Sequence, residues 1–174
     1  MGTWRQMSKK AQAGQLERDG VPWHPPSGSW ASSQGNRRSM VGNRSRDTKP
    51  ELALRSLVHA AGLRYRVAQR PLPEIRRSVD LVFGPAKVAV FVDGCFWHGC
   101  PEHYVPPKTN PDYWNSKIGG NVVRDRDTDA KLEAAGWLVL RFWEHEDPAS
   151  ASEEVVRTVV QRRARASGPR APRT

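Results

Sequence analysis

Residues 79–94 read V-D-L-V-F-G-P-A-K-V-A-V-F-V-D-G, and this stretch decides the predicted fold. It contains two runs rich in valine and phenylalanine, residues 79–83 and 87–92, with Gly84 and Pro85 between them. β-Branched and aromatic residues favour strands, and a Gly-Pro pair favours a turn. The stretch therefore predicts a central β-hairpin, to which the rest of the chain is added on both sides.

The residues before this hairpin predict a helix and a further strand. T-K-P-E at residues 48–51 has the form of a capping box, with a proline suited to the first helical turn. Apolar residues at positions 54, 57, 58 and 61 then recur at the spacing of one helix face. Gly62 is typical of a helix end, and the alternation of residues 63–67 predicts a strand with one exposed face.

The residues after the hairpin predict three helices and one strand. Residues 111–118 form a short helical pattern, residues 121–135 a longer one that Gly136 ends, and residues 137–143 a strand. S-A-S-E at residues 150–153 is a second capping box, and the apolar face of its helix is predicted to contain Val155, Val156, Val159 and Val160. The order α-β-β-β-α-α-β-α predicts an α/β domain, a mixed sheet flanked by helices.

The composition excludes several classes of protein. The chain has 174 residues and a formal net charge of +10, which suits one domain with tails. It contains no run of 18 apolar residues, and its first ten residues lack the apolar stretch of a secretory signal. Two cysteines cannot form a disulfide framework. A membrane protein, a disulfide-stapled secreted module and a wholly disordered chain are thus excluded, and we expect no membrane partner.

The positive charge is concentrated at the two ends of the chain. Residues 1–46 carry eight Lys and Arg against two acids, and residues 157–174 carry six Arg and no acid. Basic segments of this kind favour a polyanionic partner, although charge alone does not distinguish nucleic acid from acidic lipid. We expect a basic, flexible extension over residues 1–39, a folded domain over residues 40–166 and a disordered basic tail over residues 167–174.

Two carboxylates accompany the predicted hairpin. Asp80 lies inside the first apolar strand, and Asp93 directly follows the second. A hairpin could bring both to one end of the sheet, where they would form a site for a hard cation such as Mg²⁺. The alternative is that Asp80 caps a strand and that Asp93 and Gly94 form an ordinary turn.

Both cysteines of the chain follow immediately, in C-F-W-H-G-C-P-E-H at residues 95–103. Cys95, Cys100 and His103, together with His145 after the last predicted strand, form a Cys₂His₂ set of the kind that binds tetrahedral zinc. The alternative is two buried free thiols and two surface histidines.

His98 lies between the two cysteines and close to the predicted carboxylates. A neutral imidazole can take a proton from water, or give one to a leaving oxygen, near pH 7. Alternatively, His98 replaces His103 as the third zinc ligand. The neighbouring Phe96 and Trp97, together with Trp114, are either core residues or an exposed aromatic wedge that separates stacked bases.

Several ordered motifs together resemble the very short patch repair (Vsr) family of DNA mismatch endonucleases. They are F-V-D-G-C-F-W-H-G-C-P-E-H at 91–103, N-R-S-R-D-T-K-P-E at 43–51, Y-W-N-S-K-I-G-G-N at 113–121, R-D-R-D at 124–127 and G-W-L-V-L-R-F-W-E-H at 136–145. The resemblance implies a restriction-endonuclease-like fold, a structural zinc, and Mg²⁺-dependent nicking of double-stranded DNA. The implied cut lies 5′ of the T in a T:G mismatch left by deamination of 5-methylcytosine.

The resemblance also implies roles for individual residues. Asp80 matches the Mg²⁺-binding aspartate, His98 the catalytic histidine, and Glu51 an acid that supports the active site. The zinc positions match Cys95, Cys100, His103 and His145, and the DNA-contacting positions match Phe96, Trp97, Trp114 and Met40. The expected protein is a bacterial, cytoplasmic monomer that works on the nucleoid, with mismatch-repair proteins as candidate partners.

The chain departs from the family pattern at three places. Restriction-type sites commonly have an acid-x-Lys motif after the second strand, whereas this chain has Asp93-Gly94-Cys95, so proton transfer falls to His98. Some relatives have Thr-His where this chain has Val92 and Asp93; the Val92 backbone carbonyl could still bind Mg²⁺, and Asp93 is kept as a catalytic candidate. Some relatives have Cys in place of His145. Two rival functions remain: a non-catalytic zinc-stabilised DNA-binding module, and a nuclease for another lesion or site.

Overall fold

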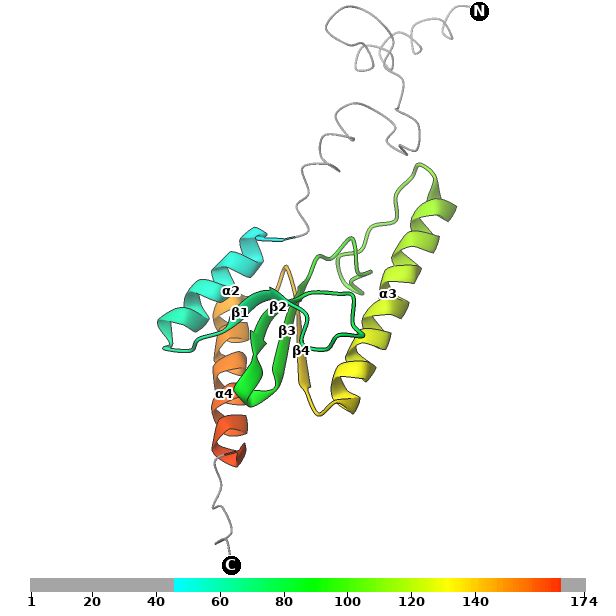
Figure 1. Ribbon diagram of the computed structural model, residues 1–174. Coiled ribbons are helices and arrows are strands. Elements are labelled where there is room, and N and C mark those ends of the chain that lie inside the picture. Colours follow the sequence, from blue (N-terminus) through cyan, green and yellow to red (C-terminus); the bar gives the residue numbers. More distant parts are fainter. Residues whose placement is uncertain (1–45, 167–174) are drawn as a thin grey trace, which may run out of the picture. The chain divides into compact units, whose positions relative to one another are not determined.

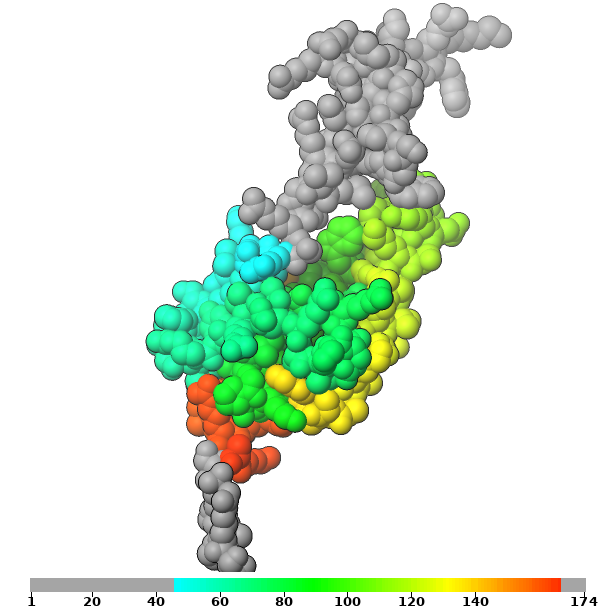
Figure 2. All heavy atoms as spheres, in the orientation of Figure 1, coloured from blue at the N-terminus to red at the C-terminus, as the bar shows by residue number. Residues whose placement is uncertain are grey.

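The computed structural model describes residues 46–166, shown in colour in Figures 1 and 2. The predicted extension over residues 1–39, the predicted tail over residues 167–174, and Met40 lie outside the described residues. Within residues 46–166, no helix combines the length and the apolar character needed to cross a membrane.

A mixed sheet of four strands forms the centre of the fold. The strands are β1 (Arg66–Gln69), β2 (Val79–Phe83), β3 (Val88–Asp93) and β4 (Leu138–Trp143), and they lie side by side in sequence order. β1, β2 and β3 pair antiparallel, whereas β4 pairs parallel with β3. The predicted central hairpin is confirmed, and its turn is a short 3₁₀ helix at Gly84–Ala86.

Helices cover both faces of this sheet (Figure 1). Helices α2 (Lys49–Ala60) and α4 (Pro148–Ala166) pack together on one face, where Val58 and Val155 share a core with Leu81 and Phe83. Helix α3 (Pro111–Ala134) lies on the other face and contributes Leu132 to a second core. The α/β class with a mixed, helix-flanked sheet is confirmed.

The segment between β1 and β2 lies beside α3, as Figure 2 shows. Its Ile75 packs into the same core as Leu132 of α3. The guanidinium of Arg77 forms an ion pair with Asp125, also on α3. This segment therefore ties α3 to the edge of the sheet where β1 lies.

The two predicted helices over residues 111–118 and 121–135 are in fact the single helix α3. Gly119 and Gly120 stand in its middle, and a Cβ added at Gly119 would meet no atom within 4 Å. Glycine costs a helix about 1 kcal/mol relative to alanine. Burial of Ile118 before the pair and of Leu132 after it outweighs that cost, because both halves of the helix pack on the domain.

The helix starts differ from the predicted capping boxes. At α2, Glu51 accepts a hydrogen bond from the backbone N–H of Asp47 at 3.0 Å and another from the Thr48 hydroxyl, also at 3.0 Å. The reciprocal bond from Thr48 to the helix backbone is not made. At α4 the predicted Ser150 cap is wrong: the helix begins at Pro148, and Asp147 accepts hydrogen bonds from both the N–H and the hydroxyl of Ser150.

Three further boundaries and faces differ from prediction. β1 comprises residues 66–69 and not 63–67, because the buried Leu63 completes the end of α2 through a bond from its N–H to the Val58 carbonyl. β4 begins one residue late, because the Trp137 N–H bonds to the Leu132 carbonyl. Val160 is 52% exposed and lies outside the buried face of α4, which comprises Ala151, Ser152, Val155 and Val159, with Val156 partly buried against the same core.

Candidate active site and metal centre

Asp80 lies where β2 and β3 meet, near the beginning of β2 and the end of β3. Its Oδ2 accepts a hydrogen bond of 2.9 Å from the backbone N–H of Val92. Burial raises the pKa of Asp80 to about 7, and the nearby carboxylates of Glu51 and Asp93 add to the shift. The predicted partners Asp80, Val92, Glu51 and Asp93 are therefore brought into one region, in which a cation would offset a concentration of buried negative charge.

Glu51 reaches this region from the first turn of α2. The residue is 3% exposed, and its carboxylate accepts a hydrogen bond of 2.8 Å from Arg55 one helical turn later. Arg55 is itself buried and also pairs with Asp47. The helix thus delivers an acid to the interior together with the cation that compensates it.

His98 is held by a carboxylate of α3. Its Nδ1 lies 2.6 Å from Oδ2 of Asp125 and 3.6 Å from Oδ1 of Asp93. Burial by itself lowers the pKa of His98, but the bond to Asp125 and the charge of Asp93 outweigh it and raise the pKa. Because Nδ1 is hydrogen-bonded to Asp125, Nε2 is the ring nitrogen that can exchange a proton with a substrate or water.

Asp93 is buried and paired with an arginine. Oδ2 of Asp93 accepts a hydrogen bond of 2.6 Å from NH1 of Arg141 on β4. Arg141 also binds Asp129 on α3 through Nε and NH2. Burial raises the pKa of Asp93, although the charge of Arg141 opposes the shift.

A pocket of about 280 Å³ opens beside these side chains. Its lining includes Asp93, His98, Asp125, Arg126, Asp129 and Arg141. The pocket combines an imidazole, carboxylates and guanidinium groups, and such a set can bind a phosphate and move a proton.

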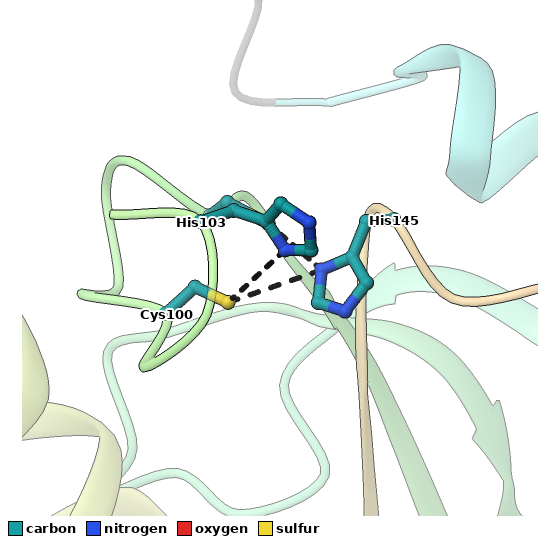
Figure 3. Close-up of side chains that lie close together, drawn as sticks. Cys100, His103 and His145 are labelled. Carbon is teal, nitrogen blue, oxygen red and sulfur yellow. Dashed lines mark hydrogen bonds between the residues drawn. The ribbon is translucent and has the colours of Figure 1, made fainter. Parts of the chain in front are cut away.

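The cysteines and two histidines form a second cluster, separate from the carboxylates. One ligand atom from each of Cys95, Cys100, His103 and His145 lies within 4.8 Å of all the others. The Sγ atom of Cys95 is 3.1 Å from Nδ1 of His145, and that of Cys100 is 3.9 Å from Nδ1 of His103. Figure 3 shows Cys100 and His103 pointing from their loop toward His145, which follows β4. The cluster could hold a metal ion, and its histidine from the loop is His103, not His98.

The loop over residues 94–103 is fixed at both ends by backbone hydrogen bonds. The N–H groups of Trp97 and His98 bond to the Gly94 carbonyl, and the N–H of Cys100 bonds to the Cys95 carbonyl. Glu144 joins the loop to β4, since its carboxylate accepts a bond of 2.7 Å from the Cys95 N–H. Asn121 of α3 donates its side-chain N–H to the Trp97 carbonyl at 2.8 Å. The same short loop therefore carries His98, which bonds to α3, and three residues of the Cys/His cluster.

A family model described as DNA mismatch endonuclease Vsr matches residues 32–103 of the chain. One relative, the type II nicking enzyme V.NaeI of Lentzea aerocolonigenes, is 48% identical over 127 residues, or 72% of this chain and 76% of that protein. The chain belongs to the Vsr family.

Two other relatives agree with this assignment. The type II nicking enzyme V.XorIIP of Xanthomonas oryzae is 41% identical over 66% of this chain and 83% of its own length. The DNA mismatch endonuclease Vsr of Escherichia coli is 39% identical over 57% of this chain and 62% of its own length. The Vsr resemblance predicted from the sequence motifs is confirmed.

The three aromatic residues singled out in the Vsr-like motifs are in mutual contact. The ring centroids of Phe96 and Trp97 are 5.2 Å apart, and those of Phe96 and Trp114 are 5.3 Å apart. Phe96 and Trp97 are half-buried, whereas Trp114 is 8% exposed. The rings thus form one cluster at the start of α3, with Trp114 beneath the other two.

Sequence reasoning missed the partners that hold His98 and Asp93. Asp125 lies in the quoted R-D-R-D motif and Arg141 in the quoted motif over residues 136–145, which were the only signals for them, and Asp129 carried none. These residues are linked by contacts across 27 residues between His98 and Asp125, and across 48 between Asp93 and Arg141. Such pairings depend on the packing of α3 against the sheet and leave no local pattern.

The raised pKa of Asp80 predicts a pH-dependent gain in stability for Asp80→Asn in metal-free protein. An unfolded Asp ionises near pH 4, whereas Asp80 in the folded protein ionises near pH 7, so its burial costs stability that grows between these values and is complete above pH 7. Asparagine keeps an oxygen for the Val92 N–H and has no charge. We expect the variant to gain roughly 1–3 kcal/mol in the free energy of unfolding at pH 8 and nothing at pH 4.

Urea unfolding of both proteins in EDTA at the two pH values measures this difference. Asp127→Asn, at an exposed position on α3, is the matched control and should change stability little at either pH. A loss of stability in Asp80→Asn at pH 8 would contradict the expectation.

Proposed function

We propose that this chain is a Mg²⁺-dependent DNA endonuclease that nicks one strand of double-stranded DNA 5′ of the T in a T:G mismatch. The observation that carries the proposal is the placement of the half-buried Asp80 against the backbone of Val92. Asp93 lies near both Asp80 and His98. A DNA-binding module without catalysis has no use for a carboxylate buried at such a cost. The names of the relatives, nicking enzymes and a DNA mismatch endonuclease, support the same reaction class.

The residues around Asp80 fit a divalent cation. Asp80 supplies a carboxylate, and the backbone carbonyl of Val92 is the proposed second protein ligand, with Glu51 as a supporting acid. Mg²⁺ prefers one or two carboxylates together with water and phosphate oxygens. When bound, it would neutralise charge on the scissile phosphate and lower the pKa of a water molecule.

His98 is the proposed proton-transfer residue. Asp125 fixes the ring through Nδ1 at 2.6 Å, which orients Nε2 and favours one tautomer. The chain has Gly94 and Cys95 where restriction-type sites commonly have the x-Lys of an acid-x-Lys motif, so no lysine competes for this role. Asp93 completes the site as the second carboxylate facing the imidazole.

We propose that the Cys/His cluster holds a structural zinc. Zinc with thiolate and imidazole ligands is tetrahedral, with bonds of about 2.3 and 2.0 Å, so neighbouring ligand atoms lie about 3.3–3.8 Å apart. The separations of 3.1, 3.8 and 3.9 Å between sulfur and nitrogen atoms are close to this range. The metal would join the loop after β3 to the end of β4, as Glu144 already does.

The aromatic cluster is the proposed wedge at the mismatch. Phe96 and Trp97 follow Cys95 directly, so the metal loop fixes their direction, and Trp114 supports them from α3. A mispaired step is cheaper to unstack than a normal one, which favours insertion at T:G. Met40 is the proposed contact from the segment before residue 46.

The wider setting follows from the same family membership. A mixed sheet with helices on both faces is compatible with a restriction-endonuclease-like fold, which we propose for the domain. The proposed protein is a cytoplasmic bacterial monomer that acts on the nucleoid, with mismatch-repair proteins as candidate partners.

The proposed reaction predicts a specific nick. End-labelled duplexes with T:G or C:G at one position are incubated with Mg²⁺ or with EDTA. We expect a cut 5′ of the T only in the T:G duplex, and only when Mg²⁺ is present. His98→Ala should lower the single-turnover rate by about 10²–10⁴-fold, the usual contribution of a general acid or base. His59→Ala, at an exposed position near the end of α2, should keep the full rate. Equal cutting of both duplexes would indicate another target, and binding without any cutting would indicate a non-catalytic module.

The proposed zinc site predicts a metal content that depends on His103 and not on His98. Mass spectrometry of the native protein should find one zinc per chain in the wild type and in His98→Ala, and little in His103→Ala or Cys100→Ser. Zinc-free but folded wild-type protein would overturn the assignment, and loss of zinc in His98→Ala would assign the third ligand to His98.

The proposed wedge predicts an affinity loss for Trp97→Ala. Stacking on a base is worth about 1–3 kcal/mol per ring, so binding of T:G duplex should weaken by roughly ten- to a hundred-fold. Trp137→Ala serves as control, since Trp137 packs against the core that contains Leu132 and should lose stability without losing affinity per folded molecule. A fall in melting temperature for Trp97→Ala with unchanged affinity would show that its ring is structural.

A further inference from the structure

The side chain of Arg141 contacts residues of both β3 and α3. It lies on β4 directly opposite Phe91 of β3, and its guanidinium carbon is 4.3 Å from the centre of that ring. Its Nε and NH2 donate to Asp129 on α3 at 2.9 and 2.8 Å, and its NH1 donates to Asp93 at the end of β3 at 2.6 Å. All three nitrogens are therefore engaged, and the guanidinium plane is fixed between strand and helix.

The geometry around His98 places two carboxylates near one ring nitrogen. Oδ2 of Asp125 is within hydrogen-bond distance of Nδ1 at 2.6 Å, whereas Oδ1 of Asp93 is 3.6 Å away. An imidazole Nδ1 carries one proton and can donate it to one acceptor at good geometry. Which carboxylate receives it decides the orientation of the ring and the direction of Nε2.

Arg141 distinguishes the two carboxylates. NH1 of Arg141 donates to Oδ2 of Asp93 at 2.6 Å, whereas NH2 of Arg141 is 3.9 Å from Oδ1 of Asp125. Asp125 is paired on its other oxygen with Arg77, so that oxygen is turned away from the ring. Arg77 thus holds Asp125, whereas Arg141, itself bound to Asp129, holds Asp93.

We infer that Arg141 is a positioning residue for His98. By binding Asp93 it keeps that carboxylate beyond hydrogen-bond distance from Nδ1, so Asp125 alone orients the imidazole. Without Arg141 the buried Asp93 loses its cation, and the nearest positive or donating group for it is the His98 ring. The ring then shifts toward Asp93, and Nε2 leaves the direction set by Asp125. This inference rests on the proposed role of His98 in nicking.

The kinetic test compares Arg141→Met with Lys131→Met. Methionine keeps most of the aliphatic part of either side chain without its charge. Lys131 forms an exposed ion pair with Asp127 on α3, which makes it a matched control. Arg141→Met should lower the single-turnover nicking rate by about 10–100-fold, as a misplaced catalytic group does, with T:G binding unchanged. The control should retain the wild-type rate.

The double variant Asp93→Asn/Arg141→Met separates positioning from simple loss of structure. The amide that replaces the Asp93 carboxylate has no charge and attracts the Nδ1–H less strongly, so in the double variant the ring should return to Asp125. The Nδ1 signal of His98 measures this return, since Asp93 is itself a proposed site residue and its loss would lower the nicking rate. The double variant also lacks the buried Asp93 charge that Arg141→Met leaves unpaired. It should therefore fold even if Arg141→Met folds poorly. A double variant whose Nδ1 signal stays as in Arg141→Met, or an Arg141→Met variant that nicks at the wild-type rate, would overturn the inference.

The ring itself gives a readout that does not need activity. In ¹⁵N-histidine-labelled protein, the His98 resonances, identified by their loss in His98→Ala, should show a hydrogen-bonded Nδ1–H in the wild type and a changed Nδ1 signal in Arg141→Met. The double variant should restore the wild-type signal. An unchanged Nδ1 signal in Arg141→Met would overturn the inference, whether or not the protein nicks DNA. Absence of nicking in the wild type would overturn only the proposed function.

Discussion

The antiparallel pairing of β2 with β3 brings the chemistry of this domain to one end of the sheet. It sets Asp80 against the backbone of Val92, and it ends β3 at Asp93, from which the loop carrying His98 and the cysteines departs. Both strands are buried on both faces by α2, α4 and α3, so the register of the pair cannot shift without moving apolar side chains out of both cores. This pairing places Asp80, Asp93 and the loop with His98, and Glu51 joins them from α2.

The candidate site balances acids with arginines, and each pair links different elements or successive turns. Glu51 is matched by Arg55 within α2, Asp125 by Arg77 from the segment before β2, and Asp93 by Arg141 from β4. Asp80 differs from these acids, because its strongest polar contact is a backbone N–H and its pKa is raised to about 7. Among these four acids, the one without an arginine ion pair is thus the one assigned to the metal, a pattern expected where a divalent cation takes the place of a side-chain cation.

The sequence predicted the local features of this site and missed its long-range ones. The hairpin and the aromatic neighbours could be predicted because their residues are close together in the sequence. The Cys/His cluster could be predicted because the chain has only two cysteines, Cys95 and Cys100, and few histidines to combine with them. The single helix α3 was missed because Gly119 and Gly120 look like a break, whereas packing on either side overrides their low helix propensity. The pairings of Asp125, Asp129 and Arg141 form only when α3 packs on the sheet. The position of a charged residue in a helix or strand does not indicate which residue it will pair with.

The parallel pairing of β3 with β4 requires the chain to leave the sheet, form α3 and return. The residues of the Cys/His cluster stand at both ends of this crossover, with Cys95 and His145 separated by 50 positions. A metal bound there would close the whole crossover into a ring, as a disulfide would. Closure of a ring of that size removes about 4 kcal/mol of chain entropy from the unfolded state in the loop-entropy model. The stabilisation would act on the parallel pairing of β3 with β4, which joins residues far apart in the sequence and is therefore costly in chain entropy to form.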